Sequence, residues 1–91
     1  MTLLKIYTED TKREKLLKLV SRYFQGFTMY KTTGYWKGLA EKSLCFEIIP
    51  ESLFNYRDEV KRLCKDIKIM NSQESVMVIE VKAESQEVSF I

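Results

Sequence analysis

One segment of the chain, residues 30–41, gathers the side chains best suited to hold a small ligand. It reads YKTTGYWKGLAE and contains the only tryptophan of the chain, Trp36, and two of its three glycines. Aromatic rings can stack on a base, a lysine can pair with phosphate, and a glycine lets the backbone approach a ligand closely. The segment predicts a binding site made of Gly34, Tyr35, Trp36, Lys37, Gly38 and Glu41.

Two threonines ahead of the first helical pattern extend this candidate site. Thr8 and Thr11 lie where hydroxyl and free backbone N–H groups at the start of a helix can bind an anion, and Lys5 adds a cation for phosphate. The expected ligand is therefore a small anion such as a nucleotide. The structural alternative is an ordinary hairpin in which Trp36 packs on the edge of the core and the glycines form bulges or turns.

The chain lacks the residues that several classes of enzymatic reaction require. The chain has no histidine, which removes Ser-His-Asp and Cys-His catalysis and most zinc sites. Gly34 and Gly38 are not followed by the Lys-Ser/Thr pair of a phosphate-binding loop. The two cysteines fall in apolar patterns typical of buried, structural thiols. We predict no catalytic residue, metal or cofactor, and an enzyme that uses Glu41 or Glu47 is the weaker alternative.

The charge pattern gives little support to a nucleic-acid or membrane partner. The net charge is only +2. Residues 12–22 are rich in lysine and arginine, but a helix that covers a core must show charge to solvent, and Glu14 with Lys18 is a favourable i, i+4 pair. The N-terminal residues lack the features of a signal peptide, so we expect a cytoplasmic protein.

Four short segments have the composition of strands. Their residues are β-branched or aromatic, or alternate between apolar and polar. Glycines between the second and third segments predict a hairpin with its turn within 33–38, and Pro50 ends the third because it has no N–H for pairing. The strands are expected at 3–7, 27–32, 44–49 and 76–81, with an edge strand or docking tail at 88–91.

Two helical patterns separate these strands. Thr11 and Glu14 form a capping-box motif ahead of an apolar stripe over 16–24, and Ser52 is a plausible cap for a second helix with its buried face over 53–67. The order β-α-β-β-α-β predicts an α+β, ferredoxin-like fold in which two helices cover one face of an antiparallel sheet. We expect residues 1–91 to form a single such domain.

The second face of the predicted sheet is also apolar. If the helices cover the face that contains Leu4 and Ile6, then Leu3, Tyr7 and Cys45 point away from them. Such a surface predicts a homo-oligomer. Two alternatives are a C-terminal segment that folds back over the face and a register shifted by one residue, which would exchange the two faces.

With its element order and its aromatic, glycine-containing hairpin, the chain resembles the PII/CutA-like group of ferredoxin-like proteins over nearly its whole length. The resemblance implies trimers with inward-facing sheets, and nucleotides or other small effectors bound in clefts between subunits near residues 33–41. The chain departs from the group by lacking a long regulatory loop and a metal-binding Cys/His set. The hairpin is also similar to small proteins of phages and mobile elements, which would imply a stoichiometric binder of a host nucleotide or protein.

Together these features favour a non-enzymatic, oligomeric regulatory protein that binds or sequesters a small ligand, with a nucleotide held at subunit clefts near the hairpin. The main alternative is a protein–protein interaction module, an inhibitor or adaptor, whose aromatic hairpin inserts into a partner.

Overall fold

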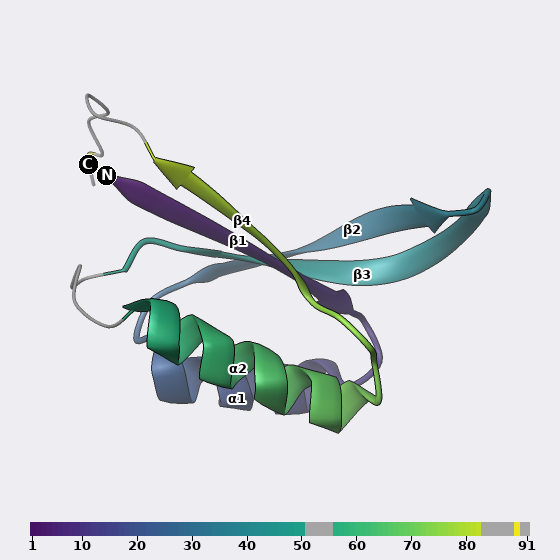
Figure 1. The fold of residues 1–91 in the computed structure, drawn as a ribbon, viewed down its shortest axis with the longest axis horizontal. Coiled ribbons are helices and arrows are strands. Elements are labelled where there is room, and N and C mark those ends of the chain that lie inside the picture. Colours follow the sequence, from purple (N-terminus) through teal and green to yellow (C-terminus); the bar gives the residue numbers. More distant parts are fainter. Residues whose placement is uncertain (51–55, 83–88, 90–91) are drawn as a thin grey trace.

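The computed structural model describes residues 1–50, 56–82 and 89, and it has two layers (Figure 1). One layer is a four-stranded antiparallel sheet and the other is a pair of helices. The fold is the α+β, ferredoxin-like arrangement that the sequence predicts. Along the chain the elements are β1 (Thr2–Glu9), α1 (Arg13–Tyr23), β2 (Thr28–Trp36), β3 (Leu39–Ile48), α2 (Tyr56–Asn71) and β4 (Met77–Lys82).

The order of the strands explains why both helices cover the same face. The strands lie side by side as β2-β3-β1-β4, so each of the units β1-α1-β2 and β3-α2-β4 crosses over one strand. Because such crossovers are right-handed, the two helices pack on one side of the sheet. Figure 1 shows α1 and α2 together on that side. We call the opposite side the open face, since no described element covers it.

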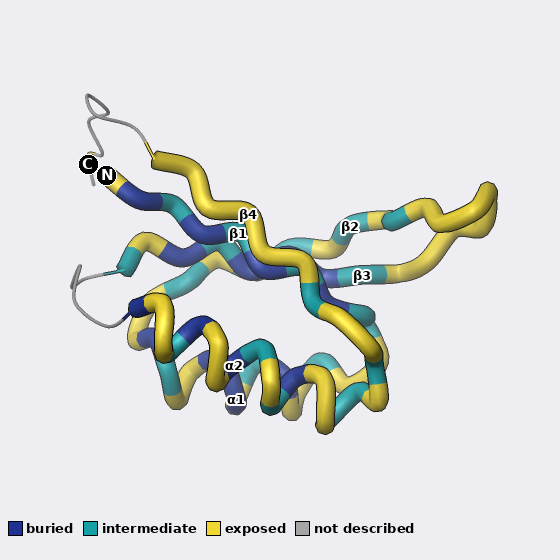
Figure 2. The backbone as a smooth tube through the Cα atoms, viewed as in Figure 1, coloured by how far each residue is buried: buried dark blue, intermediate teal, exposed yellow. Residues whose placement is uncertain are grey.

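The core lies between the sheet and the helices. On β1 buried and half-buried positions alternate, so Leu4 and Ile6 face the helices while Lys5 and Tyr7 belong to the open face. Phe46 is the register partner of Ile6 and is fully buried; burying a side chain of this kind contributes about 1.5–3 kcal/mol. Figure 2 shows the buried positions where the two layers meet. Further core residues are Leu16, Leu19, Val20, Leu44, Ile48, Val60, Leu63 and Ile67.

The start of α1 differs from the sequence prediction. The N-cap residue is Lys12, and no side-chain hydrogen bond caps the helix, so the predicted capping box of Thr11 and Glu14 is wrong. The Thr11 hydroxyl donates instead to Asn71 Oδ1 at 3.1 Å. A tertiary contact between the start of α1 and the end of α2 has taken the group that would have capped the helix.

The hairpin turn is tighter than the glycine-rich sequence suggests. β2 continues to Trp36 and β3 begins at Leu39, which leaves Lys37 and Gly38 as a two-residue turn. Both have positive φ, 50° and 79°, as in the type I′ turn. This turn matches the right-handed twist of the two strands, so their ladder can run to the tip.

Two predictions fall on residues outside the described ranges: the Ser52 cap of the second helix, and, apart from residue 89, the edge strand or tail at 88–91. Of the two described helices, neither is long and apolar enough to cross a membrane.

Candidate ligand site at the hairpin

The β2–β3 hairpin extends beyond the rest of the sheet (Figure 1). β1 pairs with β3 only as far as Ser43, whereas β2 and β3 remain paired out to Trp36 and Leu39. The outer hairpin is therefore a two-stranded ribbon, and Figure 2 shows it largely exposed. Tyr35, Trp36 and Leu39 are 75%, 67% and 72% exposed. Trp36 does not pack on the edge of the core, so the structural alternative for this side chain is wrong.

The register of the hairpin divides the predicted site between two faces. Trp36 lies opposite Leu39, and Gly34 lies opposite Glu41; these four residues belong to the open face. Tyr35 alternates with them and belongs to the other side, which faces in the same direction as the helices. Within one copy of the chain, Tyr35 and Trp36 therefore cannot stack on the same ligand.

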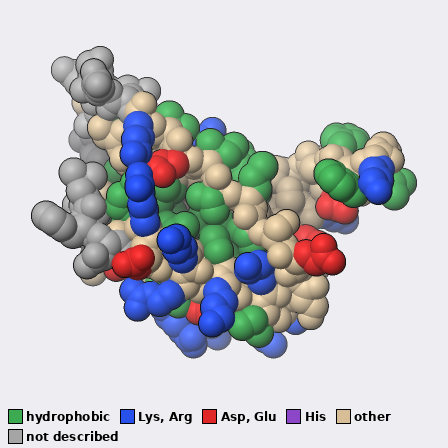
Figure 3. Space-filling model, in the orientation of Figure 1, with side chains coloured by type: hydrophobic (Ala, Val, Ile, Leu, Met, Phe, Trp, Pro, Cys, Tyr) green, Lys and Arg blue, Asp and Glu red, His purple; other side chains and the backbone are tan. Residues whose placement is uncertain are grey.

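The turn brings a cation to the tryptophan. Lys37 Nζ lies 5.9 Å from the centre of the Trp36 ring, which is within the range of a cation–π contact. Gly38 supplies the second left-handed position of the turn, at φ 79°. Figure 3 shows hydrophobic, basic and acidic side chains close together at the projecting end of the molecule. The tip thus combines an exposed indole with a positive charge.

Gly34 has a different role from Gly38. It lies within β2 and has no positive φ, and a Cβ added there would come no closer than 4.0 Å to the carbonyl oxygen of Glu41. Backbone strain therefore does not require glycine here. Its missing side chain leaves the strand open beside Trp36, on the same face.

The two predicted threonines are not near the tip. Thr8 lies on the helix side of β1, is only 2% exposed, and donates its hydroxyl hydrogen to the carbonyl oxygen of Glu9 at 3.1 Å. Thr11 bonds to Asn71 at the far end of β1 from the N-terminus. Because β1 continues through Glu9, its alternation turns Thr8 into the core, and the structure does not join either threonine to the hairpin residues.

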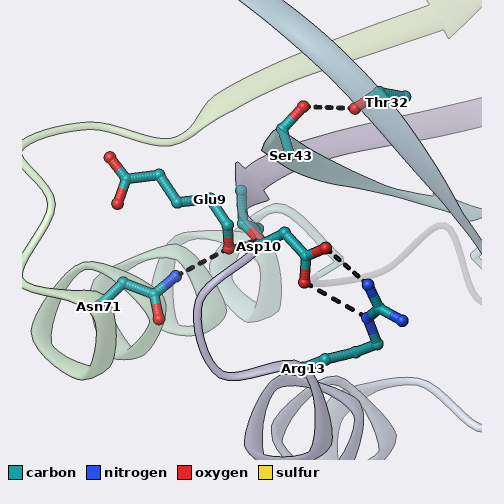
Figure 4. A network of polar contacts seen from close by, with 7 residues as sticks. Glu9, Asp10, Arg13, Thr32, Ser43 and Asn71 are labelled. Atoms are coloured by element: carbon teal, nitrogen blue, oxygen red, sulfur yellow. Dashed lines mark hydrogen bonds and ion pairs between the residues drawn. The ribbon is translucent and has the colours of Figure 1, made fainter. Parts of the chain in front are cut away.

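A polar network lies at the base of the hairpin (Figure 4). Asn71 Nδ2 donates to the Glu9 carbonyl oxygen at 3.4 Å, and Asp10 forms an ion pair with Arg13 at 2.6 Å. The Arg13 hydrogen bond lowers the pKa of the Asp10 carboxyl from its ordinary value. These contacts connect the ends of β1 and α2. Among the described residues, no three His, Cys, Asp or Glu side chains are grouped as metal ligands.

At the centre of the open face, Cys45 is fully buried between two tyrosines. Its register partners are Tyr7 on β1 and Tyr30 on β2. Hydrogen bonding to Cys45, followed by desolvation, raises the pKa of the Tyr30 phenol, and desolvation is the largest cause that raises the pKa of Tyr7. The thiol is buried, as its apolar sequence context indicates. The next row along the strands holds an ion pair, Lys5 to Glu47 at 3.6 Å.

Apolar side chains surround this central row. On β4, three exposed residues alternate onto the open face and follow the register of β1: Met77 opposite Tyr7, Ile79 opposite Lys5, and Val81 opposite Leu3. Their exposed fractions are 56%, 39% and 38%. Around the central row the open face is therefore largely apolar, as the alternation in the sequence indicates, and the ion pair of Lys5 and Glu47 lies next to that row.

Three residues that the sequence analysis did not select share the face of Trp36. Thr32 and Ser43 are register partners whose hydroxyl oxygens lie 2.5 Å apart, and Glu9 is the partner of Ser43 on β1. Counting back from Trp36 in two steps of two residues, past Gly34, would have found Thr32. Ser43 and Glu9 could be placed only with the register of three strands.

Comparison with known proteins identifies the fold. No protein-family model matches the chain, and no curated protein matches it. A phage SAM lyase in complex with S-methyl-5′-thioadenosine has a similar structure, with 18% identity over 94% of this chain and 92% of that chain and a TM-score of 0.66. A DUF3240 family protein from Shewanella baltica OS155 is similar at 10% identity, with 98% and 96% of the chains covered and a TM-score of 0.70.

A third similar structure belongs to the group that the sequence resembles. It is CPII, a nitrogen regulatory PII-like protein from Thiomonas intermedia K12, bound to ADP, AMP and bicarbonate. The identity is 16%, the match covers 94% of each chain, and the TM-score is 0.60. The predicted architectural resemblance to PII-like proteins is therefore confirmed: this chain has the ferredoxin-like fold of that structure.

Proposed function

We propose that this protein is a non-enzymatic, cytoplasmic homo-oligomer that binds a small ligand with an adenosine-like base in a cleft between subunits, bordered by the β2–β3 hairpin. Its subunit is the whole chain, residues 1–91, as one ferredoxin-like domain. Binding would sequester the ligand or transmit its presence to a partner, which makes the protein regulatory.

The observation that carries this proposal is the exposure of Trp36 on the same face as the apolar surface of the sheet. The indole at the end of the projecting ribbon is 67% exposed, and among the described residues its ring interaction is the cation–π contact with Lys37. A flat ring in this position suits a nucleobase, because stacking contributes about 1–3 kcal/mol per base. A single copy of the chain does not enclose such a ligand, so the second wall has to come from another subunit.

The apolar open face supports the oligomer. Water-exposed surfaces of this kind usually mark interfaces. The proposed interface contains Tyr7, Met77, Ile79 and Val81, and it continues along β2 and β3 into the face of the hairpin that contains Trp36. Copies joined through the sheet would therefore bring a neighbour close to the hairpin.

Two structures of the same fold support the class of ligand. The phage SAM lyase is described with S-methyl-5′-thioadenosine, and CPII with ADP and AMP. The common part of these molecules is adenine joined to ribose. Because identity is below 20% in both cases, the ligand of this chain is a proposal that rests on the hairpin and not on the likeness.

The test uses Trp36 as a probe, since it is the only tryptophan. Titration with S-methyl-5′-thioadenosine, AMP and ADP should change the tryptophan fluorescence in a saturable way, and at least one of them should raise the melting temperature because it binds only the folded protein. Light scattering should give a mass above that of one chain. A monomer at micromolar concentration, or no response to any of the three compounds, contradicts the proposal.

A second candidate function is protein–protein interaction through the hairpin tip. It is favoured by the exposure of Tyr35 and Leu39, 75% and 72%, on opposite faces of the ribbon. Aromatic side chains of this kind act as anchors in interfaces. This candidate predicts that loss of Tyr35 and loss of Trp36 weaken partner binding alike, whereas the ligand-binding proposal involves only Trp36 of these two aromatic residues.

A further inference from the structure

The two faces of the hairpin carry opposite charge. On the face of Trp36, Glu41 follows Leu39 by two residues, and Glu9 lies one row further along, opposite Ser43. Among the described residues, neither of these two carboxylates forms an ion pair. On the same face Lys5 is paired with Glu47, so the charges left without an ion pair beside the hairpin are acidic, and Lys37 adds a positive charge only at the turn.

The face of Tyr35 is basic. Lys42 lies opposite Thr33, and Lys31 lies opposite Leu44, so both lysines alternate onto the helix side of the ribbon. Both contribute to lowering the pKa of Asp10, after the larger effect of Arg13, which places their positive charge near the start of α1. The two lysines that could attract a phosphate thus lie on the opposite face of the ribbon from Trp36.

We infer that the Trp36 face recognises the base and the ribose of a nucleoside and selects against phosphate, so that the ligand class is an uncharged or cationic nucleoside. This inference rests on the proposed function. The indole stacks on the base, and the carboxylate of Glu41 accepts hydrogen bonds from the ribose hydroxyls.

The chemistry of each group fits this assignment. A carboxylate has two oxygens that only accept, so it suits a pair of neighbouring hydroxyl donors, and hydrogen bonds to a charged acceptor are among the stronger ones. The hydroxyls of Thr32 and Ser43 both donate and accept, and they lie on the same face in the next row. Gly34, opposite Glu41, leaves room over the strand for the sugar.

The same carboxylates disfavour a phosphate. A phosphate group held beside Glu41 and Glu9 would meet like charge, and desolvation in a subunit cleft would strengthen this repulsion. Lys37 compensates for part of it only, because its ammonium lies over the indole ring, where the base would stack or displace it. Each added phosphate is therefore expected to weaken binding.

The experiment compares three ligands that share adenine and the ribose ring with its two hydroxyls, and differ in charge at the 5′ position. S-methyl-5′-thioadenosine should bind on the order of tenfold more tightly than AMP, and AMP more tightly than ADP, in fluorescence titrations at low salt. The difference should shrink as salt is added, because exposed charges are screened. If ADP binds as tightly as S-methyl-5′-thioadenosine, the inference is overturned while the proposed function stands. If none of the three binds, the proposed function fails and the inference falls with it.

Two neighbouring residues provide the variant and its control. Glu41→Gln should weaken S-methyl-5′-thioadenosine about tenfold and should lower its advantage over AMP, because one change removes both the acceptor charge and the repulsion. Lys42→Gln alters the adjacent position on the opposite face and should leave that advantage unchanged. If Lys42→Gln raises the advantage of S-methyl-5′-thioadenosine over AMP by as much as Glu41→Gln lowers it, net charge, and not this face, sets the preference.

A ribose analogue tests the assigned hydrogen bond directly. Adenosine should bind better than 2′-deoxyadenosine in the unchanged protein, and this preference should disappear in Glu41→Gln. A preference that survives the substitution would remove Glu41 from the ribose site. Circular dichroism of each variant controls for folding, and since Glu41 is exposed its substitution should leave the spectrum unchanged.

Discussion

The ammonium of Lys5 lies 3.6 Å from the carboxylate of Glu47, in a row of the open face whose next member is the apolar Ile79. Each of the two charged side chains retains 31% of its exposure in the single chain. Assembly through the open face would remove this pair from water. The effect of this ion pair on association of the proposed oligomer can therefore be measured by removing one or both charges.

Breaking this pair should weaken the oligomer. Lys5→Met leaves Glu47 as an uncompensated charge in the interface, and a buried charge without its partner costs about 3–5 kcal/mol. Sedimentation equilibrium should show a shift toward monomer. The double variant Lys5→Met/Glu47→Met should recover most of the association, because an apolar pair of similar size carries no desolvation penalty. If Lys5→Met and Glu47→Met each associate as well as the unchanged chain, the interface lies elsewhere.

Replacing Trp36 should separate ligand binding from stability. Trp36→Leu removes the stacking surface and should reduce affinity for S-methyl-5′-thioadenosine about fivefold to a hundredfold, corresponding to about 1–3 kcal/mol. Because this side chain is mostly exposed, its replacement should change the free energy of unfolding of the protein by no more than about 0.5 kcal/mol. Calorimetric titration measures the binding, since the fluorescent probe is lost.

The matched control for Trp36 is its neighbour. Tyr35→Leu changes an equally exposed aromatic residue on the opposite face and should leave ligand affinity unchanged. A loss of affinity in Tyr35→Leu as large as in Trp36→Leu would contradict the division of the hairpin into two faces.

Gly38→Ala should destabilise the hairpin. Gly38 has φ 79°, and a side chain in the left-handed region costs roughly 1–2 kcal/mol. Denaturant unfolding should show this loss without a change in the slope of the transition. Gly26→Ala is the control: it has no positive φ, a new Cβ there meets nothing within 4 Å, and stability should be unchanged or slightly higher. Equal loss in both variants would argue against the left-handed turn.

Acid should weaken the contact between the residue that follows β1, Asp10, and the start of α1. Arg13 lowers the pKa of Asp10 in the folded chain, so the pair contributes stability that is fully present above the unfolded pKa of about 3.9 and is lost as pH falls through the folded value. Asp10→Asn should therefore lower the melting temperature at neutral pH and flatten its decline below about pH 4.

The partner variant checks the cause of this pH dependence. Arg13→Gln should reproduce the effect of Asp10→Asn, and the double variant should add little to either. Thermal melts between pH 7 and pH 2 measure all four proteins. Additive losses in the double variant would show that Asp10 and Arg13 act independently.

The fold could be predicted because its signals are local and repeat along the chain. The alternation that turns Leu4 and Ile6 inward, and the apolar stripe from Leu16 to Val20, depend on spacing alone. The open face followed from the same alternation. The sequence predicted a Thr11 cap that the structure does not contain, because Asn71, which accepts the Thr11 hydroxyl hydrogen, lies 60 residues away and meets it only in the folded chain.

The candidate site was predicted in part, for a related reason. Composition identified Trp36, Lys37 and Gly38, but the grouping of Tyr35 with Trp36 required knowledge of the exact turn. A longer loop would have allowed both rings to meet one ligand, whereas the two-residue turn extends the ladder and forces them apart. Glu9 and Ser43 could join the site only through pairing of β1 with β3.

With a two-residue turn at Lys37 and Gly38, the face on which each aromatic side chain lies depends on whether the number of residues between it and the sheet is odd or even. Because side chains on a strand alternate with a period of two, inserting or deleting one residue between the sheet and Tyr35 would exchange the aromatic residues of the two faces. A single-codon change of length could then present Tyr35 where Trp36 now lies, while the folded core stays in place. In related chains, the length of the hairpin would therefore decide which aromatic side chain shares a face with the apolar surface of the sheet.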